Sequence, residues 1–230
     1  MAGKSIFGTD EAEVIRIHFN DEVTAFSGIK RASIKDKGIC NRCISAIAFR
    51  ALEEAGIPTH FISESGDRDM LCRKVEPLPI QVIVRNRISG TTAKMLGVEN
   101  GMRIPNTIME LSYRRKELGK PMINDHHAVA LSLATYDELK TMYDVASKAN
   151  EVLRELFHKA GIELVDIKLR FGKTAGGDVI IADEISPDNC RLWDEKDGRV
   201  LDKDRFRHDM SDVTASYREV MDRLIKSNAK

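Results

Sequence analysis

The stretch of sequence that decides the fold is residues 163–194, ELVDIKLRFGKTAGGDVIIADEISPDNCRLWD. Apolar and charged side chains alternate along its first part: the apolar set is Val165, Ile167, Leu169 and Phe171, and the charged set is Asp166, Lys168 and Arg170. A period of two predicts a half-buried strand. The glycines that follow predict a turn into a second strand, which ends in a loop crowded with acids.

The charged face of this hairpin has two interpretations. Charged side chains aligned on a sheet must be solvated, paired with opposite charges or bound to a ligand. If the hairpin pairs odd with even positions, Asp183 projects from the same face as Lys168 and Arg170. The face is then either a solvated surface with ion pairs, or a cleft floor where the bases bind phosphates and Asp183 binds a cation.

The patterns outside the hairpin predict an α+β fold. Strands are expected at 12–19, 60–64 and 80–86, and helices at 44–55 and 211–226. A long helix is expected after Thr135, which forms a capping box with Glu138. Its buried stripe is expected to be Leu139, Met142, Ala146, Ala149, Leu153 and Leu156, with Gly161 at its end. The elements lack a strict βαβ rhythm, and the prolines at 77–79 predict a junction between domains 1–78 and 79–230.

Composition restricts the class of protein. The 230 residues contain 36 Lys and Arg against 36 Asp and Glu, which argues against a dedicated nucleic-acid binder. No run of residues is long and apolar enough for a membrane span, and the N-terminal residues lack the apolar core of a signal peptide. We therefore expect a cytoplasmic protein with small-molecule partners, in which Cys40 and Cys43 stay reduced.

A second candidate phosphate site lies at 84–94, VRNRISGTTAK. A strand delivers Arg85 to a turn that contains Ser89, Gly90 and Thr91. Glycine lets backbone N–H groups face an anion, and the hydroxyls add donors. Small residues also form ordinary turns, so this pattern alone leaves both interpretations open.

Taken together, these motifs resemble the SAICAR synthetase family of purine biosynthesis. The matching stretches are DEVTAFSG (21–28), KGICNRCIS (37–45), AGIPTHF (55–61), VRNRISGTTAK (84–94), PMIND (121–125), GIELVDIKL (161–169), ADEISPDNCRLWD (182–194) and LDKDRFR (201–207). The resemblance implies an antiparallel N-terminal domain, a larger ATP-grasp-like α+β domain and a site in the cleft between them. It also implies a homodimer that uses ATP and Mg²⁺ to join an aminoimidazole ribonucleotide carboxylate to L-aspartate through an acyl phosphate.

The resemblance also assigns roles to residues of this sequence. It implies catalytic roles for Lys168 and Asp183, and nucleotide-phosphate contacts for Lys4, Arg114 and Lys168. It implies substrate contacts for Arg85, Gly90, Thr91, Arg191 and Lys203, and a metal contact for Asp183.

Four positions depart from the family pattern, and at three of them a base stands where the family has an acid. Ala2 stands where the family has the first lysine of its phosphate loop, and Arg170 stands where it has its second metal-site acid. Lys116 and Lys120 replace two further acids. An arginine in place of an acid opposes Mg²⁺ binding, because it reverses the sign of the charge interaction. Two alternatives to the family activity therefore stay open: a paralogue acting on another nucleotide-like substrate, and a non-catalytic nucleotide-binding protein.

Overall fold

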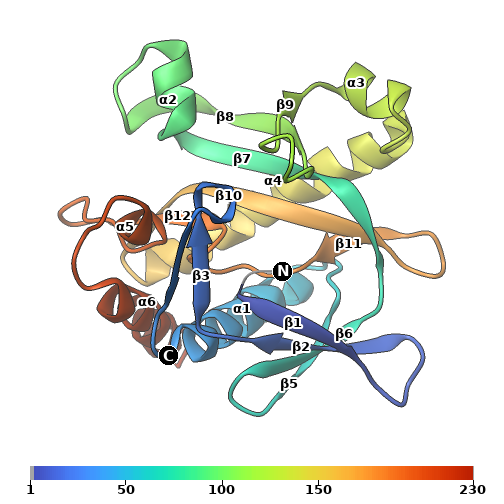
Figure 1. Ribbon diagram of the computed structural model, residues 1–230, viewed down its shortest axis with the longest axis horizontal. Coiled ribbons are helices and arrows are strands. Elements are labelled where there is room, and N and C mark those ends of the chain that lie inside the picture. Colours follow the sequence, from blue (N-terminus) through green and yellow to red (C-terminus); the bar gives the residue numbers. More distant parts are fainter. Residues whose placement is uncertain (1–2, 230) are drawn as a thin grey trace.

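The computed structural model describes residues 3–229, so the departure at Ala2 lies outside the described residues. Within residues 3–229 the strands form a four-stranded sheet, a six-stranded sheet and a two-stranded ribbon, and every ladder is antiparallel (Figure 1). The four-stranded sheet has the order β1 (Lys4–Gly8), β2 (Val14–Phe19), β6 (Asp69–Arg73) and β5 (Phe61–Ser65). The ribbon consists of β3 (Glu22–Ala25) and β4 (Lys30–Ser33).

The six-stranded sheet contains the hairpin of residues 163–182 at one side, with β11 at the end of the strand order. Its strands are β11 (Val179–Ala182), β10 (Ile162–Lys173), β7 (Glu76–Ile88), β8 (Met102–Tyr113) and β9 (Met122–Ile123), in that order, and β12 (Cys190–Asp194) also pairs with β10. The antiparallel α+β class is therefore confirmed.

The helices pack one core between the sheets. They are α1 (Lys37–Glu54), α2 (Thr91–Leu96), α3 (Asp125–Ala130), α4 (Tyr136–Lys159), α5 (Asp204–Arg207) and α6 (Val213–Asn228), with a 3-10 turn η1 (Phe26–Gly28). The capping box of α4 is present, and every residue of its predicted stripe is buried. Side chains from both parts of the chain, such as Phe49 and Leu153, belong to one continuous cluster.

The register of the hairpin differs from the prediction. Arg170 lies opposite Ala182, so even positions pair with even positions and the assumed odd-with-even pairing is wrong. Asp183 still reaches Arg170, because it follows the last residue of β11 with a left-handed φ of 76°. That conformation turns the chain out of the ladder and directs the carboxylate across the strand end.

Element boundaries differ where proline or glycine occurs. The structure starts β7 at Glu76, so the prolines predicted as a junction lie within the first residues of the strand, where missing N–H donors are tolerated. Helix α1 begins at Lys37, seven residues before the prediction, and Gly38 lies against Phe19, where an added Cβ would come 2.3 Å from a carbonyl oxygen. The chain passes from one sheet to the other between Arg73 and Glu76, and the division into two domains stays a prediction. In residues 3–229, no helix combines the length and apolarity that a membrane crossing requires.

Candidate functional site

A cleft of about 470 Å³ lies between strands β1 and β3 on one side and strands β7 and β10 of the six-stranded sheet on the other. It is lined by Lys4, Thr24, Ala25, Phe26, Gly28, Gln81, Arg114, Lys116, Lys120, Lys168, Arg170, Glu184, Asp188, Asn189, Lys203 and Arg207. Among these described residues eight are basic and two are acidic. So strong an excess of positive charge suits an anionic ligand.

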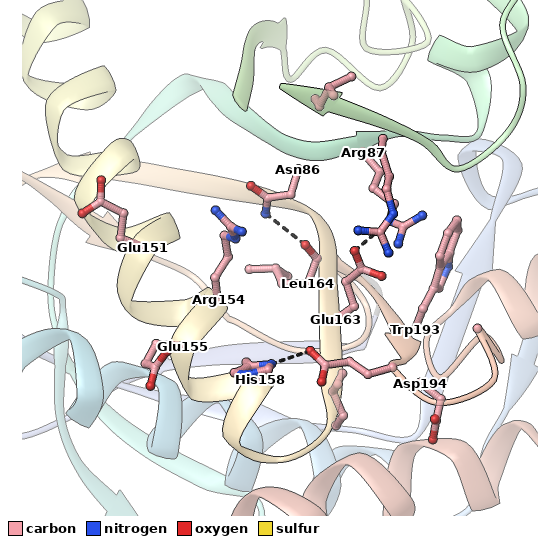
Figure 2. A pocket seen from close by; sticks show the side chains of 15 residues that line it. Asn86, Arg87, Glu151, Arg154, Glu155, His158, Glu163, Leu164, Trp193 and Asp194 are labelled. Atoms are coloured by element: carbon pink, nitrogen blue, oxygen red, sulfur yellow. Dashed lines mark hydrogen bonds and ion pairs between the residues drawn. The ribbon is translucent and has the colours of Figure 1, made fainter. Parts of the chain in front are cut away.

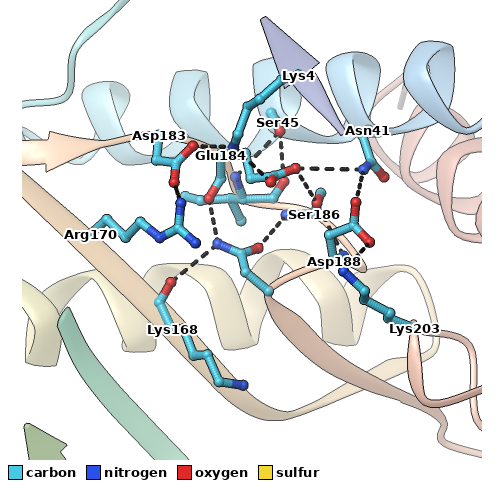
Figure 3. Close-up of polar contacts among 12 residues, drawn as sticks. Lys4, Asn41, Ser45, Lys168, Arg170, Asp183, Glu184, Ser186, Asp188 and Lys203 are labelled. Atoms are coloured by element: carbon cyan, nitrogen blue, oxygen red, sulfur yellow. Dashed lines mark hydrogen bonds and ion pairs between the residues drawn. The ribbon is translucent and has the colours of Figure 1, made fainter. Parts of the chain in front are cut away.

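One end of the cleft is a network around the acidic loop after β11 (Figure 3). Lys4 Nζ donates to Asp183 and, at 2.7 Å, to Glu184. Arg170 forms an ion pair with the other oxygen of Asp183. Burial lowers the pKa of Lys4 to about 8, although the Glu184 carboxylate opposes the shift. The Lys4 ammonium is therefore easier to deprotonate than that of an exposed lysine, and its pKa responds to any further charge in the cleft.

The loop that supplies these acids is fixed by its own side chains. The Asn189 side chain accepts from Ser186 N at 2.9 Å and donates to Glu184 O at 2.5 Å. Asn189 also donates to the backbone oxygen of Lys168 at 3.1 Å, which ties the loop to β10. Asparagine and serine side chains readily bond nearby backbone groups, and these bonds restrain the loop.

Asp188 is a second centre of contacts in the cleft. It accepts from Lys37 and Asn41, each at 2.8 Å, and from the Tyr217 hydroxyl at 3.1 Å, while Lys203 Nζ lies 3.3 Å away. Burial would raise the pKa of Asp188, but Lys203 and Lys37 hold it well below the usual range. Asp188 thus stays ionised and fixes two lysines that come from opposite parts of the chain.

Asp166 organises the other end of the site from the same strand, β10. Its side chain is fully buried and accepts from Arg85 at 3.1 Å, Ser89 at 3.2 Å and Arg191 at 2.6 Å. Burial would raise the pKa of Asp166, but Lys168, Arg191 and Arg85 lower it. The two arginines are held side by side with a fixed orientation.

Gly90 is required beside this arginine pair. Its φ of 62° is left-handed, and an added Cβ would lie 2.5 Å from Arg191 Nη2. Thr91 follows as the exposed first residue of α2. The predicted turn at 89–91 therefore lies beside Arg85 and Arg191, as the structure shows.

A larger hollow of about 1010 Å³ is lined by residues of α4 and of strands β7, β8, β10 and β12 (Figure 2). Its charges are mixed, and two pairs form within it: Arg87 donates to Glu163 at 2.7 Å, and His158 lies 2.7 Å from Glu195. None of the predicted site residues lines it. The chemistry-bearing residues gather in the smaller cleft and beside Asp166.

The family model for SAICAR synthetase matches residues 2–224. The chain belongs to the SAICAR synthetase family. A phosphoribosylaminoimidazole-succinocarboxamide synthase of Fusobacterium nucleatum is 50% identical over 221 residues, which is 96% of this chain and 93% of that protein. One of Clostridium botulinum is 48% identical over 223 residues, covering 97% of this chain and 95% of that protein.

Solved structures of SAICAR synthetases have the same fold. The enzyme of Ehrlichia chaffeensis superposes with a TM-score of 0.95 at 40% identity, over 98% of this chain and 96% of that one. A structure described as a type-2 SAICAR synthetase in complex with ADP has a TM-score of 0.94 at 43% identity, over 97% and 95% of the two chains. The fold predicted from the resemblance is confirmed.

The residues at the predicted metal position of the SAICAR synthetase family do not fit a divalent cation. Asp183 is the predicted ligand, yet Lys4 and Arg170 already neutralise its carboxylate. Within residues 3–229, no group of three or more His, Cys, Asp or Glu side chains is arranged to hold a metal ion. Each unit positive charge about 4 Å from another costs roughly 4 kcal/mol at an effective dielectric constant near 20, so Arg170 opposes Mg²⁺ there.

The remaining predicted residues fall into two groups. Lys4, Arg114, Lys168 and Lys203 line the cleft, whereas Arg85, Gly90 and Arg191 cluster at Asp166. Lys168 bridges the groups, since its Nζ lies 3.9 Å from Asp166, and burial lowers its pKa to about 8. The individual roles of these residues stay predictions.

Sequence reasoning missed several residues that hold the site together. They are Lys37, Asn41, Asp188, Asp204 and Tyr217. Asp188 belongs to the segment SPDN (186–189). Its position in a charge-dense loop after an apolar strand was the signal that could have indicated a role in the site.

Proposed function

We propose that this protein is a carbon–nitrogen ligase of purine biosynthesis that joins an aminoimidazole ribonucleotide carboxylate to the amine of L-aspartate, with ATP as the phosphoryl donor. The observation that carries the proposal is the basic cleft beside the Arg85–Arg191 pair, in a chain that belongs to the SAICAR synthetase family. Such a site offers one place for a nucleotide polyphosphate and a neighbouring one for a ribonucleotide phosphate.

The reaction proceeds in two steps. A carboxylate oxygen of the ribonucleotide attacks the γ-phosphorus of ATP, the bond from that phosphorus to the β-bridging oxygen breaks, and ADP leaves. The neutral aspartate amine then attacks the acyl carbon, the C–O bond to phosphate breaks, and the released phosphate carries off the extra amine proton. The protein contributes mainly positioning and neutralisation of phosphate charge.

Named residues supply these contributions. Lys4 and Lys168 place ammonium groups beside the transferred phosphoryl group, and Asp183 orients Lys4. Arg85 and Arg191, held by Asp166, bind the ribose 5′-phosphate next to Gly90 and Thr91. A second cation near the substrate comes from Lys203, whose ammonium is positioned by Asp188.

Relatives that bear the synthase name lend no support to the two alternatives, a nucleotide-modifying paralogue and a non-catalytic nucleotide-binding protein. We further infer, from the family resemblance, that the protein works in the cytoplasm as a homodimer. Sedimentation velocity would test the dimer: a single species with the mass of two chains is expected, and a monomer at all concentrations contradicts it.

The activity is tested by incubating the protein with carboxyaminoimidazole ribonucleotide, L-aspartate and ATP, and detecting the succinocarboxamide product by mass spectrometry. Product is expected from the native protein and is expected to be lost in Lys168→Met. Arg154→Ala, which changes a residue of the larger hollow instead, is the matched control and should retain activity. Absence of product from well-folded native protein would contradict the proposal.

A further inference from the structure

Within residues 3–229, three of the eight bases that line the cleft have no acidic partner. Lys4, Lys168, Arg170, Lys203 and Arg207 each lie within ion-pair distance of a carboxylate. The other three, Arg114, Lys116 and Lys120, belong to the segment 114–120 between β8 and β9, which we name the basic loop. In the part of the chain that the structure describes, no carboxylate compensates these three charges.

The basic loop is a built structure that faces the cleft. Lys120 N donates to Arg115 O at 3.0 Å, Gly119 N donates to Lys116 O at 3.0 Å, and Arg114 N donates to Pro79 O at 2.8 Å. Lys120 itself has a left-handed φ of 57°, which keeps its side chain on the cleft side of the turn. The backbone hydrogen bonds of the loop therefore fix the positions from which its cations reach the cleft.

Like charges converge where the basic loop meets β10. Burial lowers the pKa of Lys120, and the cations Arg170, Arg114, Lys203 and Lys116 lower it further. Gathering cations in a partly buried space is unfavourable unless an anion joins them. A ligand that carries several negative charges would therefore relieve the repulsion between these cations.

Arg170 stands at the centre of this convergence. Its guanidinium pairs with Asp183, while its buried Nε has no hydrogen-bond partner within residues 3–229 (Figure 3). A guanidinium presents several donors in a planar fork that matches phosphate oxygens. It offers a fixed positive charge at the position where the family resemblance leads one to expect an acid with a divalent cation.

We propose that this cleft binds the polyphosphate of a nucleoside triphosphate through Arg170 and the basic loop, without a divalent cation held by the protein. The side chains neutralise the charge that a carboxylate-held metal would otherwise neutralise. The inference rests on the proposed function in one respect, namely that the cleft is the nucleotide site. It adds that nucleotide recognition is independent of Mg²⁺.

The first test measures binding of adenylyl imidodiphosphate, a non-hydrolysable ATP analogue, by isothermal titration calorimetry in excess EDTA and in excess Mg²⁺. We expect the two dissociation constants to agree within about threefold. ADP and AMP should bind progressively more weakly in EDTA, because each lost phosphate removes charge that the cleft neutralises. An affinity at least about tenfold higher with Mg²⁺, or no binding in either buffer, would overturn the inference.

Two variants assign the effect to named groups. Lys116→Ala should weaken binding in EDTA by about tenfold. Arg115→Ala is the matched control, because Arg115 is in the same loop but pairs with Glu117 and does not line the cleft. Equal losses in both variants would contradict a role for the cleft-facing side chains.

Arg170→Glu should create a dependence on Mg²⁺ of at least about tenfold in the same titration. Circular dichroism establishes whether this variant folds, and the Lys116→Ala result tests the inference if it does not. Binding in EDTA without formation of the succinocarboxamide product would overturn the proposed function but not this inference. Product formation with strictly Mg²⁺-dependent binding would do the reverse.

Discussion

Asp166 is the residue on which the arrangement of Arg85 and Arg191 depends. It has no solvent exposure, and two guanidinium groups and one hydroxyl converge on its carboxylate. A buried charge of this kind is costly alone and is retained only with its partners. The same contacts that orient Arg85 and Arg191 therefore also stabilise the fold.

Replacing Asp166 should accordingly be destabilising. Asp166→Asn keeps the volume but leaves buried arginines without their carboxylate, and we expect the free energy of unfolding to fall by about 3 kcal/mol. Urea denaturation followed by circular dichroism measures it. Asp178→Asn, at an exposed position of the same hairpin, should change stability by less than about 0.5 kcal/mol. Equal stability of the two variants would show that Asp166 is not the organising charge.

Lys168 and Lys4 predict a pH dependence of nucleotide binding. Burial lowers the pKa of each to about 8 in the free protein. Anion binding favours the protonated forms, so affinity is full below pH 8 and is lost as the pH rises through that value. Between about pH 7 and about pH 9.5 the affinity of adenylyl imidodiphosphate should fall about tenfold or more.

The same titration with Lys168→Arg supplies the control for this pH dependence. A guanidinium stays charged throughout the range, so the fall in affinity should become shallower. An unchanged slope in the variant would mean that Lys168 does not titrate at the nucleotide site.

Among the elements, β10 connects the two ends of the site. Its alternation places Asp166, Lys168 and Arg170 on one face, while the other face packs into the core. Asp166 meets the arginines, Arg170 meets the acidic loop, and Lys168 lies between them. One strand thereby fixes the spacing of the two proposed phosphate sites, and strands hold such spacings more precisely than loops do.

Helix α4 supports that strand, and its N-terminal cap is testable by itself. Thr135 accepts from Glu138 N at 3.2 Å, and Glu138 accepts from Thr135 N at 2.8 Å. Thr135→Ala should lower the free energy of unfolding by about 1 kcal/mol in urea denaturation. Thr141→Ala in the second turn of α4 should be neutral or slightly stabilising, because alanine is the better helix former there. A loss in Thr141→Ala as large as that in Thr135→Ala would contradict the capping argument.

These two elements also show what could be predicted from the sequence. The period of β10 and the capping box of α4 are local signals, and each was sufficient to predict its element from the sequence. The hairpin register did not follow from the alternation of side chains, and the left-handed φ that brings the Asp183 carboxylate to Arg170 had no signal in the sequence pattern. The bond between Lys4 and Asp183 spans 179 residues, and the pairing of Asp188 with Lys37 likewise depends on tertiary packing that no short pattern encodes.

At the scale of the whole molecule, positive and negative side chains are equal in number but unevenly distributed. The 36 basic and 36 acidic residues cancel overall, yet eight bases and two acids line the cleft within the described residues. Elsewhere the charges pair on the surface, as Lys140 does with Asp144 at 2.6 Å on α4. A neutral protein with a positive cleft attracts anions locally without binding polyanions over its entire surface.

This separation predicts that nucleotide binding depends on salt although the fold does not. Raising NaCl from about 0.1 M to about 1 M shortens the Debye length from about 10 Å to about 3 Å, which screens the part of the attraction not made by direct contact. The affinity of adenylyl imidodiphosphate in EDTA should fall about tenfold, as measured by calorimetry. Lys120→Ala should flatten this dependence because it removes one uncompensated cation of the cleft, whereas Lys140→Ala should leave it intact because Lys140 lies on the surface of α4. A salt dependence equally reduced in both variants would mean that net charge, rather than its concentration in the cleft, attracts the nucleotide.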